Sequence, residues 1–134
     1  MAVDAELRDH VLDLFAGLAP LRSARMFSGL GIYTENDVMF AMVAASGTVY
    51  MKSDASTHAA YAAAGAQPFT YTRANGTQQV TSLMSLPDSA MDDPDEALQW
   101  AQTSLPPARA AADKKRAEKV RKAARKQMQK QTGS

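Results

Sequence analysis

The stretch RMFSGLGIY, residues 25–33, is the part of the sequence that comes nearest to a phosphate-binding loop. A P-loop needs a lysine and a hydroxyl residue directly after its last glycine, whereas Ile and Tyr follow here. The dinucleotide-binding fingerprint needs a third glycine that opens a helix, and this stretch lacks that glycine. Because glycine adopts the positive φ of a tight connection without steric cost, we predict that Gly29 and Gly31 form a turn between two strands.

The residues that flank these glycines, Arg25 and Tyr33, are candidates for binding a protein partner, because Arg and Tyr are favoured at interfaces. In a second interpretation, Arg25 pairs with a carboxylate of the same chain while Phe27 and Tyr33 fill the core. A third interpretation is a small enzyme or ligand-binding domain that uses the Arg25–Tyr33 turn and the cleft beside it.

Side chains that perform nucleophilic or metal chemistry are scarce in this sequence. There is no cysteine, which excludes disulfides and thiolate sites, and the two histidines, His10 and His58, have no neighbouring ligands at zinc spacing. Asp54 lies four residues before His58, but it is explained as a helix cap, as is the acidic run at 92–96. We expect no catalytic, cofactor-binding or metal site, and therefore a protein that is not an enzyme.

The charge of the chain is strongly segregated. Its net charge is +1, but residues 1–108 hold five basic and twelve acidic side chains, a net of −7, and residues 109–134 hold ten basic and two acidic ones, a net of +8. Blocks of like charge often mark interaction tails. No apolar run approaches the ~18 residues of a membrane span and no secretory signal opens the chain, so we expect a cytoplasmic protein.

The basic C-terminal segment is the strongest candidate for a functional site. Its cations can neutralise phosphates, with an affinity that falls steeply with salt and shows little sequence preference. The opposing interpretation is a solubilising tail, or one that folds against the acidic remainder of the chain. The candidate nucleic-acid-binding residues are Lys114, Lys115, Arg116, Lys119, Arg121, Lys122, Arg125 and Lys126.

Hydrophobic periodicity predicts an α+β fold. Apolar residues at spacings of three and four predict a helix over 7–18, capped by Asp4, and short alternating runs predict strands within 22–52. Both alternating sets are apolar in 38–43, which is typical of a central strand covered on both faces. A helix follows Ser53 or Asp54 and ends at Gly65.

The C-terminal half predicts one further hairpin and one further helix. Asn75-Gly76 joins two strands, and Asp93 caps a helix whose first residue is Pro94. Pro106-Pro107 is expected to end the body of the protein. We therefore predict an antiparallel sheet of about five to six strands flanked by helices over residues 1–106, and a basic helical or disordered tail over 107–134.

In order and spacing, these stretches resemble the N-terminal domain of the TfoX/Sxy family of competence regulators. RMFSGLGIY is similar to the family's R-M-F-G-G-x-G-[IL]-Y, MFAMVA and VYMK to its strand pair, and AAGAQPFTY to its A-A-G-x-x-P-F-x-Y. LP at 86–87 before DPDEALQWA completes the resemblance, which covers about residues 7–105. Ser28 stands where the family usually has glycine, and Leu83 where it often has tyrosine.

The resemblance implies a regulatory module of bacterial transcription that binds a protein partner, such as a transcription factor. For the fuller members of the family the implied partner is the cyclic-AMP receptor protein at competence promoters. Those members carry a second, C-terminal domain, whereas this chain resembles the N-terminal module alone, followed by a basic tail. We therefore expect a non-enzymatic module with a protein partner, non-specific contact of the tail with nucleic acid, and no membrane.

Overall fold

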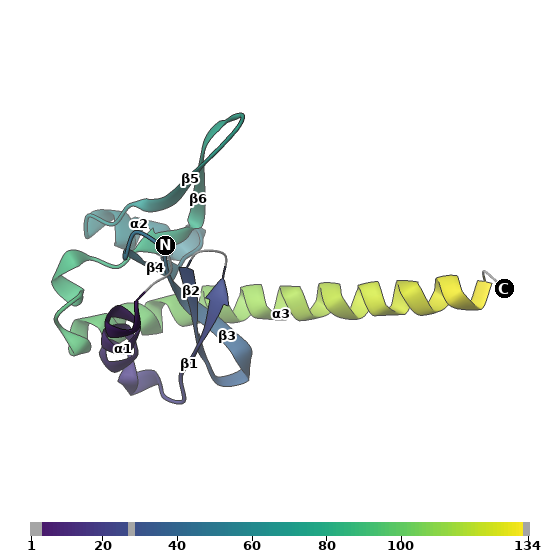
Figure 1. Ribbon diagram of the computed structural model, residues 1–134, viewed down its shortest axis with the longest axis horizontal. Coiled ribbons are helices and arrows are strands. Elements are labelled where there is room, and N and C mark those ends of the chain that lie inside the picture. Colours follow the sequence, from purple (N-terminus) through teal and green to yellow (C-terminus); the bar gives the residue numbers. More distant parts are fainter. Residues whose placement is uncertain (1–3, 27–28, 133–134) are drawn as a thin grey trace.

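The computed structural model describes residues 4–26 and 29–132, and it contains one antiparallel sheet with helices packed around it (Figure 1). The sheet has six strands in the order β1-β2-β3-β4-β6-β5. The predicted α+β class and strand number are confirmed. The bounds of the strands are β1 Arg22–Met26, β2 Gly29–Thr34, β3 Val38–Val43, β4 Val49–Lys52, β5 Pro68–Arg73 and β6 Gly76–Ser85.

The first helix, α1 (Ala5–Leu14), begins as its sequence predicts. The carboxylate of Asp4 accepts a hydrogen bond from the Leu7 amide at 2.9 Å, which satisfies one of the free N–H groups of the first turn. The helix ends earlier than expected, and the short turn η1 (Ala16–Leu18) follows it. The apolar residues of α1 and the adjoining Phe15 then face the sheet as part of the core.

A row of fully buried side chains crosses the four middle positions of the sheet. Ile32, Ala41, Met51 and Met84 lie opposite one another on β2, β3, β4 and β6, and none is more than 1% exposed. Five of the six side chains of β3 are buried, which confirms that this strand is covered on both faces. The hydrophobic core therefore sits on this part of the sheet.

Gly29 and Gly31 do not form the turn that the sequence suggested, because both lie within β2. Each has a packing reason for its missing side chain. A Cβ at Gly29 would overlap the carbonyl oxygen of Val43 on the neighbouring strand, and one at Gly31 would lie 2.9 Å from the Tyr33 ring and 3.0 Å from the Met39 sulfur. The connection between β1 and β2 falls at residues 27–28, so the prediction that Phe27 fills the core lies outside the described residues.

The predicted helix after β4 is α2 (Ala55–Ala63), and the predicted second hairpin joins β5 to β6. Asp54 caps α2 through a capping box with Thr57, and Gly65 ends the helix at a φ of +86°. In the hairpin, Arg73 is paired with Gly76, so Ala74 and Asn75 form the two-residue turn. The β5–β6 hairpin projects from the body in Figure 1.

The last helix, α3, runs from Pro94 to Thr132, after the short turn η3 (Asp88–Ala90). Asp93 caps it, accepting hydrogen bonds from the Asp95 and Glu96 amides at 3.1 and 3.2 Å. The Glu96 side chain does not complete a capping box; it accepts instead from Ser89 and from the Trp100 indole. The helix then passes beneath β3 and β4 and extends well beyond the body (Figure 1).

Pro106 and Pro107, which the sequence suggested as the end of the body, lie inside α3, and the helix continues through them. Two interior prolines cost helical hydrogen bonds and each disfavours a helix by about 3 kcal/mol. Here that cost is offset by packing, because Ser104, Pro107 and Ala108 are all buried against the body. Burial continues to the half-buried Ala112, so the packed part of the helix extends past the expected boundary at residue 106.

Tyr61 ties α2 to α3 at the centre of the molecule. Its ring is fully buried and stacks on Trp100 with a centroid separation of 4.5 Å. Its hydroxyl donates to the Trp100 carbonyl at 3.1 Å and shares a short hydrogen bond with Ser104. Burial raises the pKa of Tyr61 to about 12, and the hydrogen bond with Ser104 opposes that rise.

The raised pKa of Tyr61 predicts a specific loss of stability in alkali. The phenol ionises near pH 10 in the unfolded chain but near pH 12 in the folded one, so its contribution is complete below pH 10 and is lost as the pH rises. We expect the free energy of unfolding to fall by about 1.4 kcal/mol per pH unit between these values. Urea unfolding of wild type and Tyr61→Phe from pH 9 to 12 measures it, and equal pH slopes for the two proteins would contradict the assignment.

Candidate nucleic-acid interface

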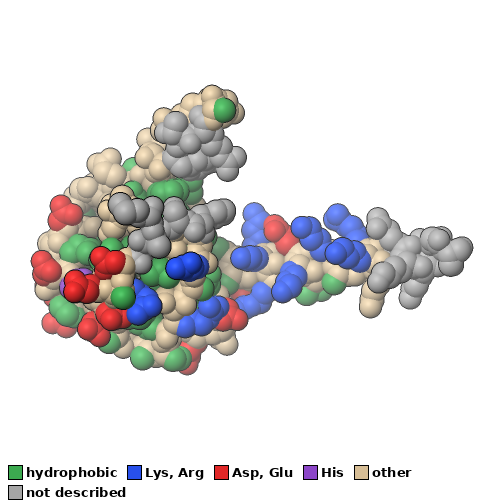
Figure 2. Space-filling view, viewed as in Figure 1, with side chains coloured by type: hydrophobic (Ala, Val, Ile, Leu, Met, Phe, Trp, Pro, Cys, Tyr) green, Lys and Arg blue, Asp and Glu red, His purple; other side chains and the backbone are tan. Residues whose placement is uncertain are grey.

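The C-terminal part of α3, residues 114–126, forms a projecting arm whose side chains are all exposed. We call this segment the basic arm. Figure 2 shows Lys and Arg side chains gathered along it, while most of the acidic side chains in this view lie on the body. The arm is helical because its alanines, lysines, arginines and glutamate are strong helix formers, and because cations stabilise the negative C-terminal end of a helix. The expected tail is therefore a helix through Thr132.

Helical spacing places the cations of the basic arm other than Arg116 in two rows. Residues three or four apart share a helix face, which places Lys115, Lys119, Lys122 and Lys126 in one row, the lysine row. With a rise of 1.5 Å per residue, this row is about 16 Å long. The second row holds Lys114, Arg121 and Arg125, and Glu118 lies within it. The lysine row is therefore an uninterrupted stripe of positive charge.

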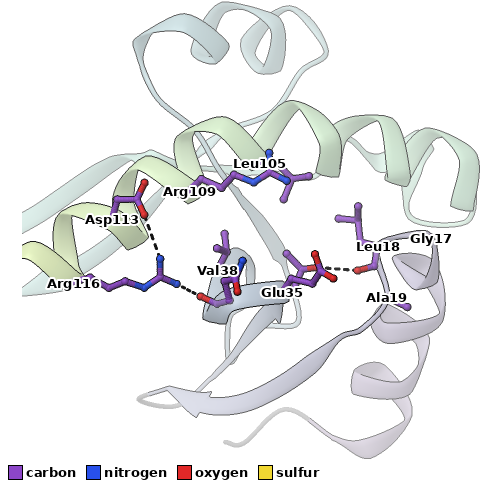
Figure 3. A pocket seen from close by; sticks show the side chains of 11 residues that line it. Gly17, Leu18, Ala19, Glu35, Val38, Leu105, Arg109, Asp113 and Arg116 are labelled. Carbon is purple, nitrogen blue, oxygen red and sulfur yellow. Dashed lines mark hydrogen bonds and ion pairs between the residues drawn. The ribbon is translucent and has the colours of Figure 1, made fainter.

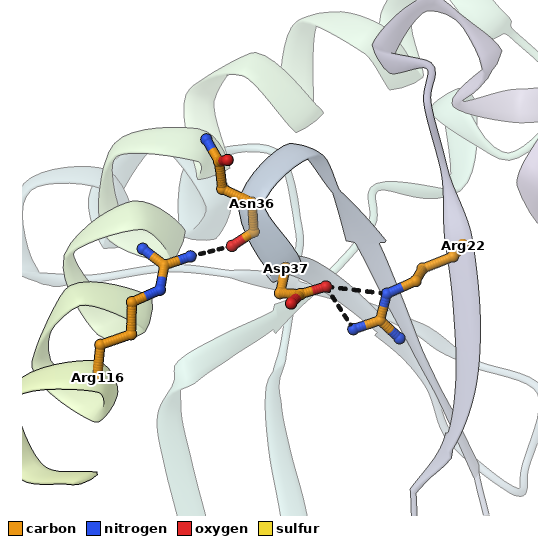
Figure 4. Close-up of polar contacts among 4 residues, drawn as sticks. All are labelled: Arg22, Asn36, Asp37 and Arg116. Atoms are coloured by element: carbon orange, nitrogen blue, oxygen red, sulfur yellow. Dashed lines mark hydrogen bonds and ion pairs between the residues drawn. The ribbon is translucent and has the colours of Figure 1, made fainter. Parts of the chain in front are cut away.

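Two of the eight predicted nucleic-acid-binding residues face the body. Arg116 donates a hydrogen bond to the backbone carbonyl of Asn36 (Figure 4) and forms an ion pair with Asp113 at 3.2 Å (Figure 3), so it anchors the base of the arm. Lys115 lines a cavity that it shares with Lys52. Within the described ranges, no ion pair engages the other six, which are Lys114, Lys119, Arg121, Lys122, Arg125 and Lys126.

The turn η2 (Glu35–Asp37) between β2 and β3 is held from both sides by arginines. Asn36 and Asp37 have φ values of 61° and 58°, and the Val38 amide closes the turn onto Glu35. Asp37 accepts two hydrogen bonds from Arg22, at 3.1 Å from Nε and 2.8 Å from Nη2 (Figure 4). With Arg116 on the other side, the turn links β1 to the base of the basic arm.

The structure does not bring Arg25 and Tyr33 together. Arg25 on β1 is opposite Leu30, whereas Tyr33 is opposite Arg22. The Arg22 guanidinium lies 4.1 Å from the centroid of the Tyr33 ring, so the half-buried Tyr33 is covered by a cation–π contact. Arg25 is exposed, and within the described residues it forms no ion pair with a carboxylate. Sequence reasoning missed Arg22 and Asp37, because only the strand register reveals their pairing.

A cavity of about 300 Å³ lies between α3, η1 and the β2–β3 turn (Figure 3). Its charged lining consists of Glu35, Arg109, Asp113 and Arg116, two acids and two bases. Asp113 and Arg116 are paired with each other there. Because its charges offset one another, this cavity has no excess charge to attract an ionic ligand.

One family model matches the chain: the TfoX N-terminal domain, over residues 13–108. The match ends at the buried Ala108, so the whole basic arm lies beyond it. The comparison with curated proteins finds no significant match. In the ranges 4–26 and 29–132, no helix combines the length and the apolar character needed to cross a membrane.

Proposed function

Because the chain belongs to the TfoX N-terminal domain family, we propose that it is a non-enzymatic regulatory module of bacterial transcription. Its α+β body binds a protein partner, and its basic arm makes non-specific contact with nucleic acid. Family membership supports the regulatory role. The basic arm lies beyond the residues that match the family model, so its contact with nucleic acid is proposed in addition to the regulatory role.

The exposed basic arm is the observation that carries the nucleic-acid half of this proposal. Six of its cations face solvent, none of them is paired within the described residues, and three of them continue the lysine row along one helix face. Such a row contacts phosphates through charge, so binding releases counterions and weakens steeply as salt rises. The arm carries no groups arranged for base readout, and we expect no sequence preference. Binding to duplex DNA at two salt concentrations tests this half.

The protein-binding half of the proposal is assigned to the free edge of β1. This strand ends the sheet, so one of its sides has no strand neighbour among residues 4–26 and 29–132, and Arg25 is exposed on it. Tyr33, on the neighbouring strand β2, contributes to this surface indirectly, because its ring holds the Arg22 side chain of β1 in a cation–π contact. An edge strand with an exposed arginine suits a partner that adds main-chain hydrogen bonds and an acidic group.

The charge-reversing variant Arg25→Glu is expected to weaken binding to a transcription-factor partner about fivefold or more, since arginine is enriched among binding hot spots. The partner to test first is the cyclic-AMP receptor protein, measured by biolayer interferometry. Arg8→Glu is the matched control, because Arg8 is an exposed arginine that belongs to α1 and not to the sheet. Equal losses for the two variants, or unchanged binding by Arg25→Glu, would remove the β1 edge from the interface.

A further inference from the structure

A second cavity, of about 230 Å³, lies between the sheet and the base of the basic arm. Tyr33 and Met39 line it from β2 and β3, and Ala108 and Ala112 line it from α3. Lys52, at the end of β4, and Lys115, the first residue of the lysine row, line it from opposite elements. Two lysines that are distant in the sequence therefore converge on one small space with a largely apolar lining.

Among the described residues, these two lysines share the cavity with one carboxylate and form no ion pair with it. Asp37 is the carboxylate among the lining residues, but its Oδ1 atom is already shared by two nitrogens of Arg22. No ion pair of Lys52 or Lys115 is present in the described part of the chain. Partial burial, and after it the positive charge of Lys115, lower the pKa of Lys52. Lys52 is thus held where its charge is disfavoured unless an anion joins it.

We propose that the cavity between Lys52 and Lys115 binds a phosphate group. A dianionic phosphate would neutralise both ammonium groups at once and offer each an acceptor oxygen, a pairing that is stronger than one between neutral groups. At about 230 Å³ the cavity is smaller than the pockets that enclose drug-sized ligands, so it suits a phosphate with few attached atoms. The phosphate belongs either to a small phosphate ester or to a nucleic-acid backbone.

The site is independent of the proposed regulatory function, because Lys52 belongs to the body and lies outside the basic arm. It is nevertheless continuous with the arm, since Lys115 begins the lysine row. The site gives a role to two features that the regulatory proposal leaves without one: a half-buried lysine at the end of β4, and the position of Lys115 at the rim of the cavity that this lysine lines.

Thermal unfolding of the full chain in inorganic phosphate, against chloride at equal ionic strength, tests the site. A ligand that binds only the folded state raises the Tm, so phosphate is expected to raise it in wild type. Lys52→Gln and Lys115→Gln are each expected to weaken phosphate binding about tenfold or more, since each removes a charge-assisted hydrogen bond to the phosphate. Lys114→Gln is the matched control, because Lys114 adjoins Lys115 but does not line the cavity.

A phosphate-dependent rise that survives Lys114→Gln and disappears in Lys52→Gln and Lys115→Gln supports the site. No rise beyond that in chloride, or an equal loss in all three variants, overturns it. Duplex DNA then identifies the source of the phosphate. If Lys52→Gln also weakens DNA binding, and inorganic phosphate competes with DNA, the group is a backbone phosphate. If DNA binding is unchanged by Lys52→Gln while the Tm effect is lost, the ligand is a small phosphate ester.

Discussion

Replacing Lys119, Lys122 and Lys126 with glutamine is expected to lower the affinity for duplex DNA by about a hundredfold or more at ~0.1 M salt. Each phosphate contact contributes about 0.9 to the slope of log affinity against log salt, so three lost contacts reduce that slope by about 2.7. The three lysines lie on one face of an exposed helix, which allows them to contact one strand of phosphates together. Fluorescence anisotropy across a range of salt concentrations measures both quantities.

The second row of the basic arm provides a control with the same change in charge. Lys114→Gln, Arg121→Gln and Arg125→Gln also remove three positive charges, but from the face that contains Glu118. We expect a clearly smaller loss from this triple variant, because a row interrupted by a carboxylate attracts phosphates less. Glutamine is a good helix former, so both variants should keep their helical circular dichroism. Equal losses in the two variants would contradict a DNA-binding lysine row and indicate diffuse attraction instead.

Phe40→Ala is expected to destabilise the fold by about 3–5 kcal/mol, a large share of the stability of an ordinary domain. The Phe40 side chain is fully buried on β3 and meets Phe15 edge to face, with ring centroids 5.2 Å apart. Its removal would leave a cavity between the region after α1 and the sheet. Urea unfolding measures the change as a shift of the midpoint at constant slope.

Tyr50→Ala is the comparison for Phe40→Ala. Tyr50 is also an aromatic residue of the sheet in an edge-to-face pair, with Phe69 at 5.1 Å, but it is only half-buried. Since less apolar surface leaves water at this position, its truncation should cost clearly less than that of Phe40. If Tyr50→Ala lowered the free energy of unfolding as much as Phe40→Ala or more, the core would not lie on the middle strands β2, β3, β4 and β6.

Features of the fold that depend only on residues close together in the sequence could be predicted. The caps Asp4, Asp54 and Asp93 all accept backbone hydrogen bonds in the first turns of their helices, because capping requires only a short polar side chain a few residues away. The need for a glycine at residue 29 within a strand could not be predicted, because it arises from the Val43 carbonyl, which approaches from another strand. Pro107 likewise stays helical through contacts with distant elements.

The candidate site shows the same division between local and distant information. Charge composition alone identified the cations of the basic arm, but it could not separate the six that, within the described residues, make no contact with the body from Arg116, which contacts Asn36, or from Lys115, which lines a cavity with Lys52. These pairs of residues are about 80 and 63 positions apart in the sequence, and only the path of α3 beneath the sheet brings them together. The Arg22–Asp37 pair was missed for the same reason.

The central claim is that the basic arm gives this family member an electrostatic contact with nucleic acid. Fluorescence anisotropy with labelled duplex DNA at two salt concentrations tests it most directly, comparing the full chain with a chain truncated after Ala117. This truncation keeps the packed Ala112 and the contact of Arg116 with Asn36, and an unchanged Tm would show that the body is intact. We predict binding by the full chain that weakens steeply with salt and is lost on truncation. Equal binding by the two chains, or binding by neither, would contradict the claim.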